Sequence, residues 1–163
     1  MWWHKYYIEL KWTGIFASAL LLWMFAERMV GLHSVHVAQH PLYTSLFAIV
    51  AVAIYILALR EKRDRAYSGE MSWQQGFHCG LRISVLVAVL SPLLQWIIHR
   101  LISPHFFTNA ATHAVQSGKM TPAEAGQYFD LSSYIIQATI GALLMGVITS
   151  ALVAFFVRSR RPD

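Results

Sequence analysis

The feature that most constrains this chain is an apolar segment from residue 77 to residue 102, FHCGLRISVLVAVLSPLLQWIIHRLI. Between Arg82 and His99 it contains no charged side chain. As a helix the segment would extend about 39 Å at about 1.5 Å per residue, whereas the hydrocarbon core of a bilayer is roughly 30 Å thick. It is too long for a helix in the core of a soluble domain. We therefore predict that it crosses a membrane.

Composition and three further apolar segments extend this prediction to the whole chain. Of the 163 residues, 56% are hydrophobic and 13% are charged, which is about half the roughly 25% charge of soluble domains. Further spans are expected at residues 12–32, 42–59 and 133–157. Residues 121–124, TPAE, have the pattern of a helix capping box. We predict an all-α integral membrane protein, a single domain with four transmembrane helices in an antiparallel bundle and a short interfacial helix between the third and fourth.

The basic residues predict how this bundle is oriented. Nine of the thirteen lysines and arginines lie in the N-terminus, the segment 60–65 and the C-terminus, and three lie in the two opposite loops. Because cytoplasmic loops carry the excess of Lys and Arg, both termini are expected in the cytoplasm. Trp2, Trp3 and Lys5 are expected to form part of an interfacial anchor, and Arg82 to reach anionic headgroups. A net charge of +5 with this distribution does not indicate a nucleic-acid partner.

Small residues recur at every fourth position of the fourth predicted span. They are Ala138, Ala142, Gly146, Ser150 and Ala154. Such a stripe allows a second helix to approach closely, which favours helix association in lipid. We expect the stripe to pack within the bundle, with a homodimer interface as the alternative.

Polar side chains gather at the predicted outer end of the spans. The candidates for a ligand pocket that opens outward are Glu27, Ser91, Gln95, His99 and Gln137. Ionisable groups inside a membrane are costly and usually face the protein interior or a watery cavity. The alternative is that Glu27 and Arg28 are merely interfacial. Because adjacent helical residues point about 100° apart, we predict that only Glu27 turns inward, where it hydrogen-bonds Gln95, His99 or a loop histidine.

Six of the eight histidines belong to the predicted outward loops or their edges. His33, His36 and His40 would share one face if their segment is helical, and grouped imidazoles bind zinc or copper. Metal sites also need a fixed geometry, and no cysteine and few carboxylates accompany these three. We therefore assign no metal and no cofactor from the sequence, and retain the three histidines as the candidate ligands.

Three stretches of the chain, taken in order, resemble a known family. They are AERMVGLHSVHVAQHPLYTSLFAI, YSGEMSWQQGF and YFDLSSYIIQATIGALLMGVITSALVAFF, within residues 26–158. They resemble the Domain of Unknown Function 4199 family of bacterial membrane proteins. The resemblance implies a small four-span protein of the cytoplasmic (inner) membrane, with Glu27, Arg28, His33 and His40 in the recurring pattern. It carries over no catalytic residue.

The sequence contains no HExxH motif or other signature of an enzyme active site. We expect a non-enzymatic accessory or structural component of the membrane. Its expected partners are the lipid bilayer and either a second copy of the chain or another membrane protein. The alternative is a transporter-like or ligand-binding protein that uses the outward polar pocket.

Overall fold

The computed structural model describes residues 3–159, with side chains from residue 6 onward. Within this range the chain forms helices and no strand, and four segments are long and apolar enough to cross a membrane. The helices that supply them are α1 (Trp3–Met29), α3 (Phe47–Ala66), α4 (Trp73–Ile97) and α7 (Leu131–Val157). The predicted all-α, four-span fold is thus confirmed. The interfacial anchor predicted for Trp2, Trp3 and Lys5 falls on side chains outside the described residues.

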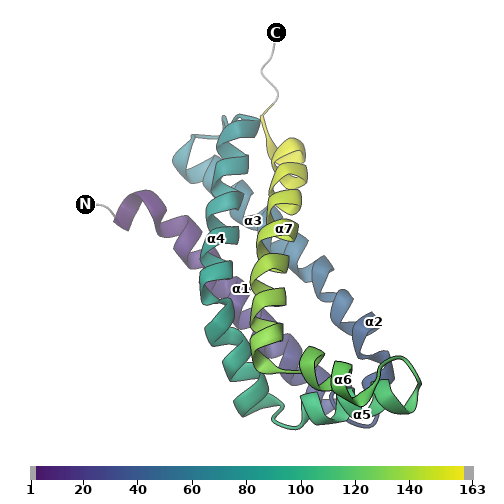
Figure 1. The fold of residues 1–163 in the computed structure, drawn as a ribbon. Coiled ribbons are helices and arrows are strands. Elements are labelled where there is room, and N and C mark those ends of the chain that lie inside the picture. The colour runs from purple at the N-terminus through teal and green to yellow at the C-terminus, as the bar shows by residue number, and fades with distance from the viewer. Residues whose placement is uncertain (1–2, 160–163) are drawn as a thin grey trace.

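Short elements connect these helices. The structure contains a 3-10 turn (Val37–Gln39), α2 (His40–Ser45), a π-helical turn (Ile98–Ile102), α5 (Phe106–Gln116) and α6 (Pro122–Tyr128). Helices α5 and α6 lie across one end of the bundle, which we call the α5–α6 end (Figure 1). The start of α1, the end of α7 and the α3–α4 connection lie toward the opposite end, which we call the terminal end (Figure 1).

The predicted short helix is α6, and its capping box is present. The Thr121 hydroxyl accepts from the Glu124 backbone N–H at 3.3 Å, and the Glu124 carboxylate accepts from the Thr121 N–H at 2.8 Å. These reciprocal bonds satisfy donors that have no partner inside the helix. Helix α5 was not predicted, because residues 103–130 read as one polar connection.

Helix boundaries at the terminal end differ from the predicted spans. Helix α1 begins before residue 12, and α3 continues through the basic segment 60–65 as far as Ala66. The predicted spans ended where apolar character ended. Arg, Lys and Glu have long, flexible side chains that lose little freedom in a helix, so the helices continue beyond the apolar segments.

The stripe of small residues on α7 packs against α4, which is its main neighbour. A Cβ added to Gly80 of α4 would lie 2.5 Å from the Ser150 hydroxyl, and one added to Gly146 would clash with Ser84. The backbones of α4 and α7 therefore touch closely along this part of the stripe. The expectation that it packs within the bundle is confirmed here.

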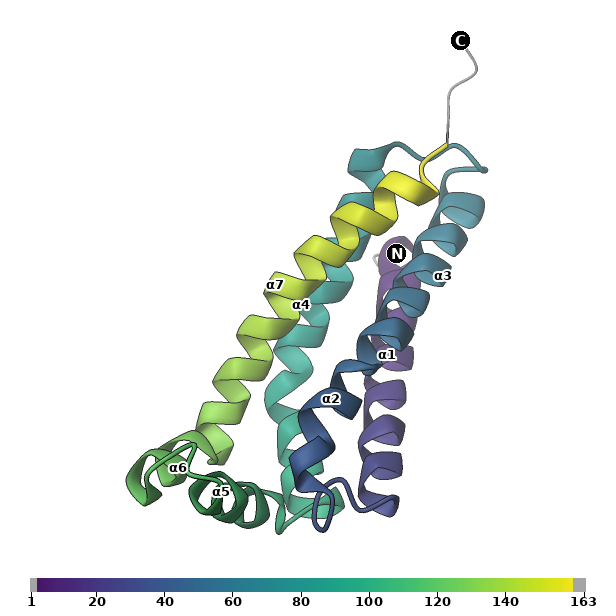
Figure 2. The ribbon, with the colours of Figure 1, turned by 90° about the vertical axis from the view of Figure 1, so that its right-hand side faces the viewer.

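The hydrophobic core occupies the terminal half of the bundle. Its most buried members include Leu59, Cys79, Ile83 and Ala154, all 0% exposed. Toward the α5–α6 end the two helix pairs seen in Figure 2, α1 with α3 and α4 with α7, enclose cavities instead. One of about 250 Å³ is lined by Leu20, Phe47, Ala138 and Ala142, among others. The part of the α7 stripe toward the α5–α6 end thus borders a cavity.

Candidate ligand pocket at the α5–α6 end

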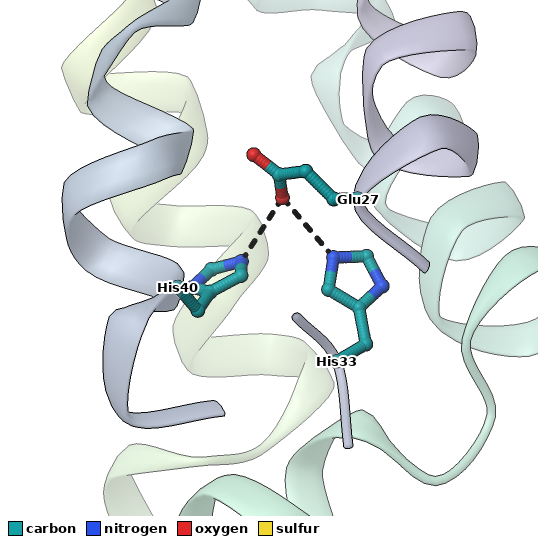
Figure 3. Close-up of side chains that lie close together, drawn as sticks. All are labelled: Glu27, His33 and His40. Carbon is teal, nitrogen blue, oxygen red and sulfur yellow. Dashed lines mark hydrogen bonds and ion pairs between the residues drawn. The ribbon is translucent and has the colours of Figure 1, made fainter. Parts of the chain in front are cut away.

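Three side chains from consecutive segments meet in the interior at the α5–α6 end (Figure 3). We call Glu27, His33 and His40 the Glu27 cluster. One carboxylate oxygen, Glu27 Oε2, lies 3.1 Å from His33 Nε2 and 3.4 Å from His40 Nε2. The exposed fractions of the three side chains are 4%, 5% and 16%. The cluster is therefore compact and largely shielded from solvent.

A tight reversal after α1 brings the three residues together. Gly31 has a φ of +79°, a left-handed conformation that glycine adopts without a steric penalty. The backbone N–H of Leu32 then donates to the Glu27 carbonyl at 3.0 Å, which closes the end of the helix. As a result His33 returns toward the last turn of α1. His40 begins α2, which has a proline at its first turn.

A second ring of polar groups holds the cluster in place. Trp23 Nε1 and Thr44 Oγ1 donate to Glu27 Oε1 at 2.6 Å and 2.8 Å. On the other side, the Ser103 hydroxyl is hydrogen-bonded to His33 Nδ1. Asn109 of α5 donates to the His33 carbonyl at 2.9 Å. Helices α1, α2 and α5 therefore all contribute to fixing these side chains.

A third imidazole, His99, lies beside the cluster. Its Nε2 is 3.0 Å from Gln95 Oε1, whereas its buried Nδ1 has no hydrogen-bond partner among the described residues. Phe106 is the common neighbour, with its ring centroid 5.3 Å from His33, 4.8 Å from His40 and 5.4 Å from His99. A buried, unpaired nitrogen calls for a water or a ligand as its partner.

Two cavities adjoin the cluster. The smaller, about 160 Å³, is lined by His33, His40, His99, Gln95 and Tyr134 among others. The larger, about 580 Å³, shares the lining residues His40, Gln95 and Tyr134 with it and is bounded by α5, α6 and α7. The wall of the larger cavity includes exposed residues such as Gln137. We call the two cavities together the α5–α6 pocket.

The residues predicted to form a ligand pocket lie in this region, although not in one wall. Gln95 and His99 line the smaller cavity, and Gln95 and Gln137 line the larger one. Ser91 instead borders the cavity near the middle of the bundle, and its hydroxyl donates to the Val87 carbonyl at 3.1 Å. The structure thus brings Gln95 and His99 together at the smaller cavity, whereas Gln137 lines the larger cavity.

The prediction for Glu27 is confirmed. Its carboxylate is buried and bonded to a loop histidine, His33, while Arg28 is exposed. The grouping of His33, His36 and His40 is wrong in one member, because His36 is exposed and Glu27 completes the set. The helical spacing used for the three does not apply, since residues 30–36 form turns.

A second buried cluster at the terminal end was missed. Glu9 is 1% exposed; its Oε1 lies 2.9 Å from Lys62 Nζ and 3.4 Å from Arg82 Nη1. We call these three residues the Glu9 cluster. Arg82, which was expected to reach headgroups, pairs with Glu9 in the structure while its side chain stays 44% exposed. Glu9 was overlooked because the first span was predicted to begin at residue 12.

Comparison with known proteins places the chain in a family. No curated protein and no solved structure matched it. The family model described as "Protein of unknown function (DUF4199)" matches residues 11–159. This range contains the four apolar helical segments almost entirely, together with the Glu27 cluster and its pocket. The chain therefore belongs to the DUF4199 family of proteins of unknown function.

Proposed function

We propose that this multi-pass membrane protein binds a small ligand in the α5–α6 pocket and catalyses no reaction on it. The observation that carries the proposal is the larger cavity, about 580 Å³, lined by His40, Gln95 and Gln137 beside the buried Glu27 cluster. Small-molecule sites typically occupy about 300–1,000 Å³ and combine apolar walls with a few placed polar groups. The α5–α6 pocket has both properties.

The cost of these polar groups supports the same proposal. A carboxylate and three imidazoles are largely buried where the apolar helices meet their connecting turns, and lipid would offer such groups no hydrogen bonds. A bundle that acted only through packing would be more stable with apolar residues at these positions. Retaining them has a physical reason if they contact a ligand.

We further propose that the protein lies in the cytoplasmic membrane of a bacterium with both termini inside. The supporting observation is the excess of Lys and Arg at the terminal end, in the N-terminus, in segment 60–65 and in the C-terminus. In this orientation the α5–α6 pocket opens to the outer side.

A cysteine-accessibility experiment tests the pocket. Ala110 lines the larger cavity and is 6% exposed, whereas Ala58 is 0% exposed in the hydrophobic core. In intact cells, a small charged thiol reagent that does not cross membranes should modify A110C and leave A58C unmodified. The native Cys79, which is also 0% exposed, provides the background in each sample.

The outcomes separate the proposal from its alternative, an accessory or structural role with a second copy or another membrane protein as partner. Modification of A110C at the rate of A58C would mean that the pocket is dry, which supports the accessory role. Modification only after the cells are permeabilised would reverse the proposed orientation. Rapid modification in intact cells supports a pocket that a ligand enters from outside.

A further inference from the structure

We propose that the Glu27 cluster binds a divalent transition-metal ion of the zinc class. The ligands are the Glu27 carboxylate and the Nε2 atoms of His33 and His40, with one coordination position left open toward the α5–α6 pocket. This inference rests on the proposed function, because the ion would form the polar floor of that pocket. The inference specifies a metal ion as the first ligand of the α5–α6 pocket.

The first argument is the spacing of the donor atoms. One ligand atom from each of the three residues lies within 4.8 Å of the other two, and the two contacts of Glu27 Oε2 are 3.1 Å and 3.4 Å. Ligands placed about 2.0–2.2 Å from a tetrahedral zinc ion are separated by distances of this order. A small inward movement of the side chains would therefore place all three on one ion.

The second argument is the support behind each ligand. The bond between His33 Nδ1 and Ser103 leaves Nε2 directed at the carboxylate, and Trp23 and Thr44 hold the other oxygen of Glu27. Metal-bound histidines almost always use their second nitrogen in such a bond, and metal-bound carboxylates are themselves hydrogen-bonded. The cluster thus has the outer partners of a coordination site.

The third argument is charge. Among the described residues, Glu27 forms its ion pairs with His33 and His40 and with no Lys or Arg. With both imidazoles neutral, a buried carboxylate would lack a compensating charge, which is costly in a low-dielectric interior. A divalent cation would remove this cost, and it requires the neutral form of the imidazoles.

The donor set selects the metal class. Imidazole ligands suit zinc, copper, iron and nickel, whereas calcium needs six to eight oxygen ligands and magnesium keeps several waters. Two histidines and one glutamate form a three-ligand zinc set that leaves the fourth position to water or substrate. Here that position faces the cavity that His99 also lines, with its unpaired Nδ1.

Metal binding can be measured directly on the full chain. The protein, purified in detergent and freed of metal with a chelator, is titrated with Zn²⁺ in a calorimeter. It is also titrated with Co²⁺, whose visible absorption distinguishes four-coordinate from six-coordinate sites. We expect one ion per chain and a four-coordinate Co²⁺ spectrum. Absence of Zn²⁺ binding, or a six-coordinate Co²⁺ spectrum, would overturn the assignment.

Variants locate the site. E27Q and H40Q should each weaken Zn²⁺ binding at least about tenfold to a hundredfold. H36A removes an exposed histidine of the same turn and should leave the affinity unchanged. Unaltered binding by E27Q and H40Q, or a matching loss in H36A, would place the metal elsewhere and contradict the proposal. Two controls show whether the variants remain folded. Their circular dichroism should match that of the natural chain, and A58C introduced into each variant should stay unmodified by the thiol reagent.

Failure of this inference differs from failure of the proposed function. If A110C is modified from outside but the protein binds no Zn²⁺, the metal assignment is wrong and the pocket takes another ligand. If Zn²⁺ binds through Glu27 while A110C stays unmodified, the metal site stands and the outward pocket does not.

Discussion

Helix α1 buries two glutamates, one near each end, and the two are held in different ways. Glu9 is 1% exposed and paired with two basic side chains, Lys62 and Arg82. Glu27 is 4% exposed and paired with two imidazoles, with an indole and a hydroxyl completing its hydrogen bonds. Glu9 thus has lysine and arginine partners, whereas Glu27 has no such partner among the described residues.

We interpret this difference as separating a structural cluster from the proposed binding cluster. The Glu9 cluster joins α1, α3 and α4 at the terminal end, where the cavity of about 480 Å³ is lined by Lys62, Arg65 and Arg82. These cations are already engaged, since Arg65 pairs with Glu61 and the other two pair with Glu9. The Glu27 cluster places two imidazole nitrogens beside a cavity instead. Burial of a charge alone therefore does not indicate function; the type of partner does.

The largest effect is expected from removing the closest basic partner of Glu9. K62M should lower the free energy of unfolding by about 3–5 kcal/mol, because Glu9 would lose its closest partner while remaining buried. Denaturation of the purified protein in detergent measures this. R60M, at an exposed neighbouring position, is the control and should change stability by less than about 0.5 kcal/mol. Equal effects of the two variants would show that the Glu9 cluster does not stabilise the fold.

A slightly smaller effect is expected at the interface of α4 and α7. G146A should destabilise the protein by about 1–3 kcal/mol through overpacking, since its new methyl group meets Ser84. Gly141 lies on the same helix, but a methyl group added there has no neighbour within 4 Å. G141A should therefore be neutral or stabilising by up to about 1 kcal/mol. If G146A and G141A have the same unfolding midpoint, α4 and α7 do not approach each other as closely as described here.

A smaller effect still is expected at the Glu27 cluster in the absence of metal. In E27Q the amide oxygen can still accept hydrogen bonds from Trp23 and Thr44. The variant removes a negative charge that no lysine or arginine among the described residues compensates. We expect its free energy of unfolding to lie within about 1 kcal/mol of that of the natural chain. A loss as large as that of K62M would show that the two clusters have the same role.

The smallest effect concerns the cap of α6. Hydrogen bonds from the Thr121 backbone and hydroxyl lower the pKa of Glu124. The carboxylate cap is therefore complete above the ordinary glutamate pKa and is lost as the pH falls through the lower pKa of the folded state. Amide hydrogen exchange in residues 123–125 should quicken, relative to α5, when the pH falls through this range, and E124Q should show no such step. A step retained in E124Q would contradict this assignment.

The features that follow from local pattern could be predicted from the sequence. Hydropathy predicted the four spans, the TPAE capping box predicted α6, and the small-residue stripe predicted the packing of α7. The inward turn of Glu27 followed from the angle between adjacent helical residues and the cost of exposing a carboxylate to lipid.

Features that depend on the path of the chain could not be predicted in the same way. The Glu27 cluster arises because Gly31 reverses the chain, so that helical spacing misassigned His36. The Glu9 cluster joins residues from three helices, and no local pattern connects Glu9 with Lys62 and Arg82. A helix stop at Gly31, between Glu27 and His33, is the sequence signal that could have pointed to the first cluster.

The most direct test of the comparison is the shift in unfolding temperature that Zn²⁺ causes in three proteins. They are the natural chain, E27Q and E9Q. A ligand that binds only the folded state at about 100 times its dissociation constant stabilises it by about 2.7 kcal/mol. We predict that Zn²⁺ raises the unfolding temperature of the natural chain and of E9Q, but not that of E27Q. The same shift in all three proteins, or a shift abolished only in E9Q, would contradict the assignment of the two clusters.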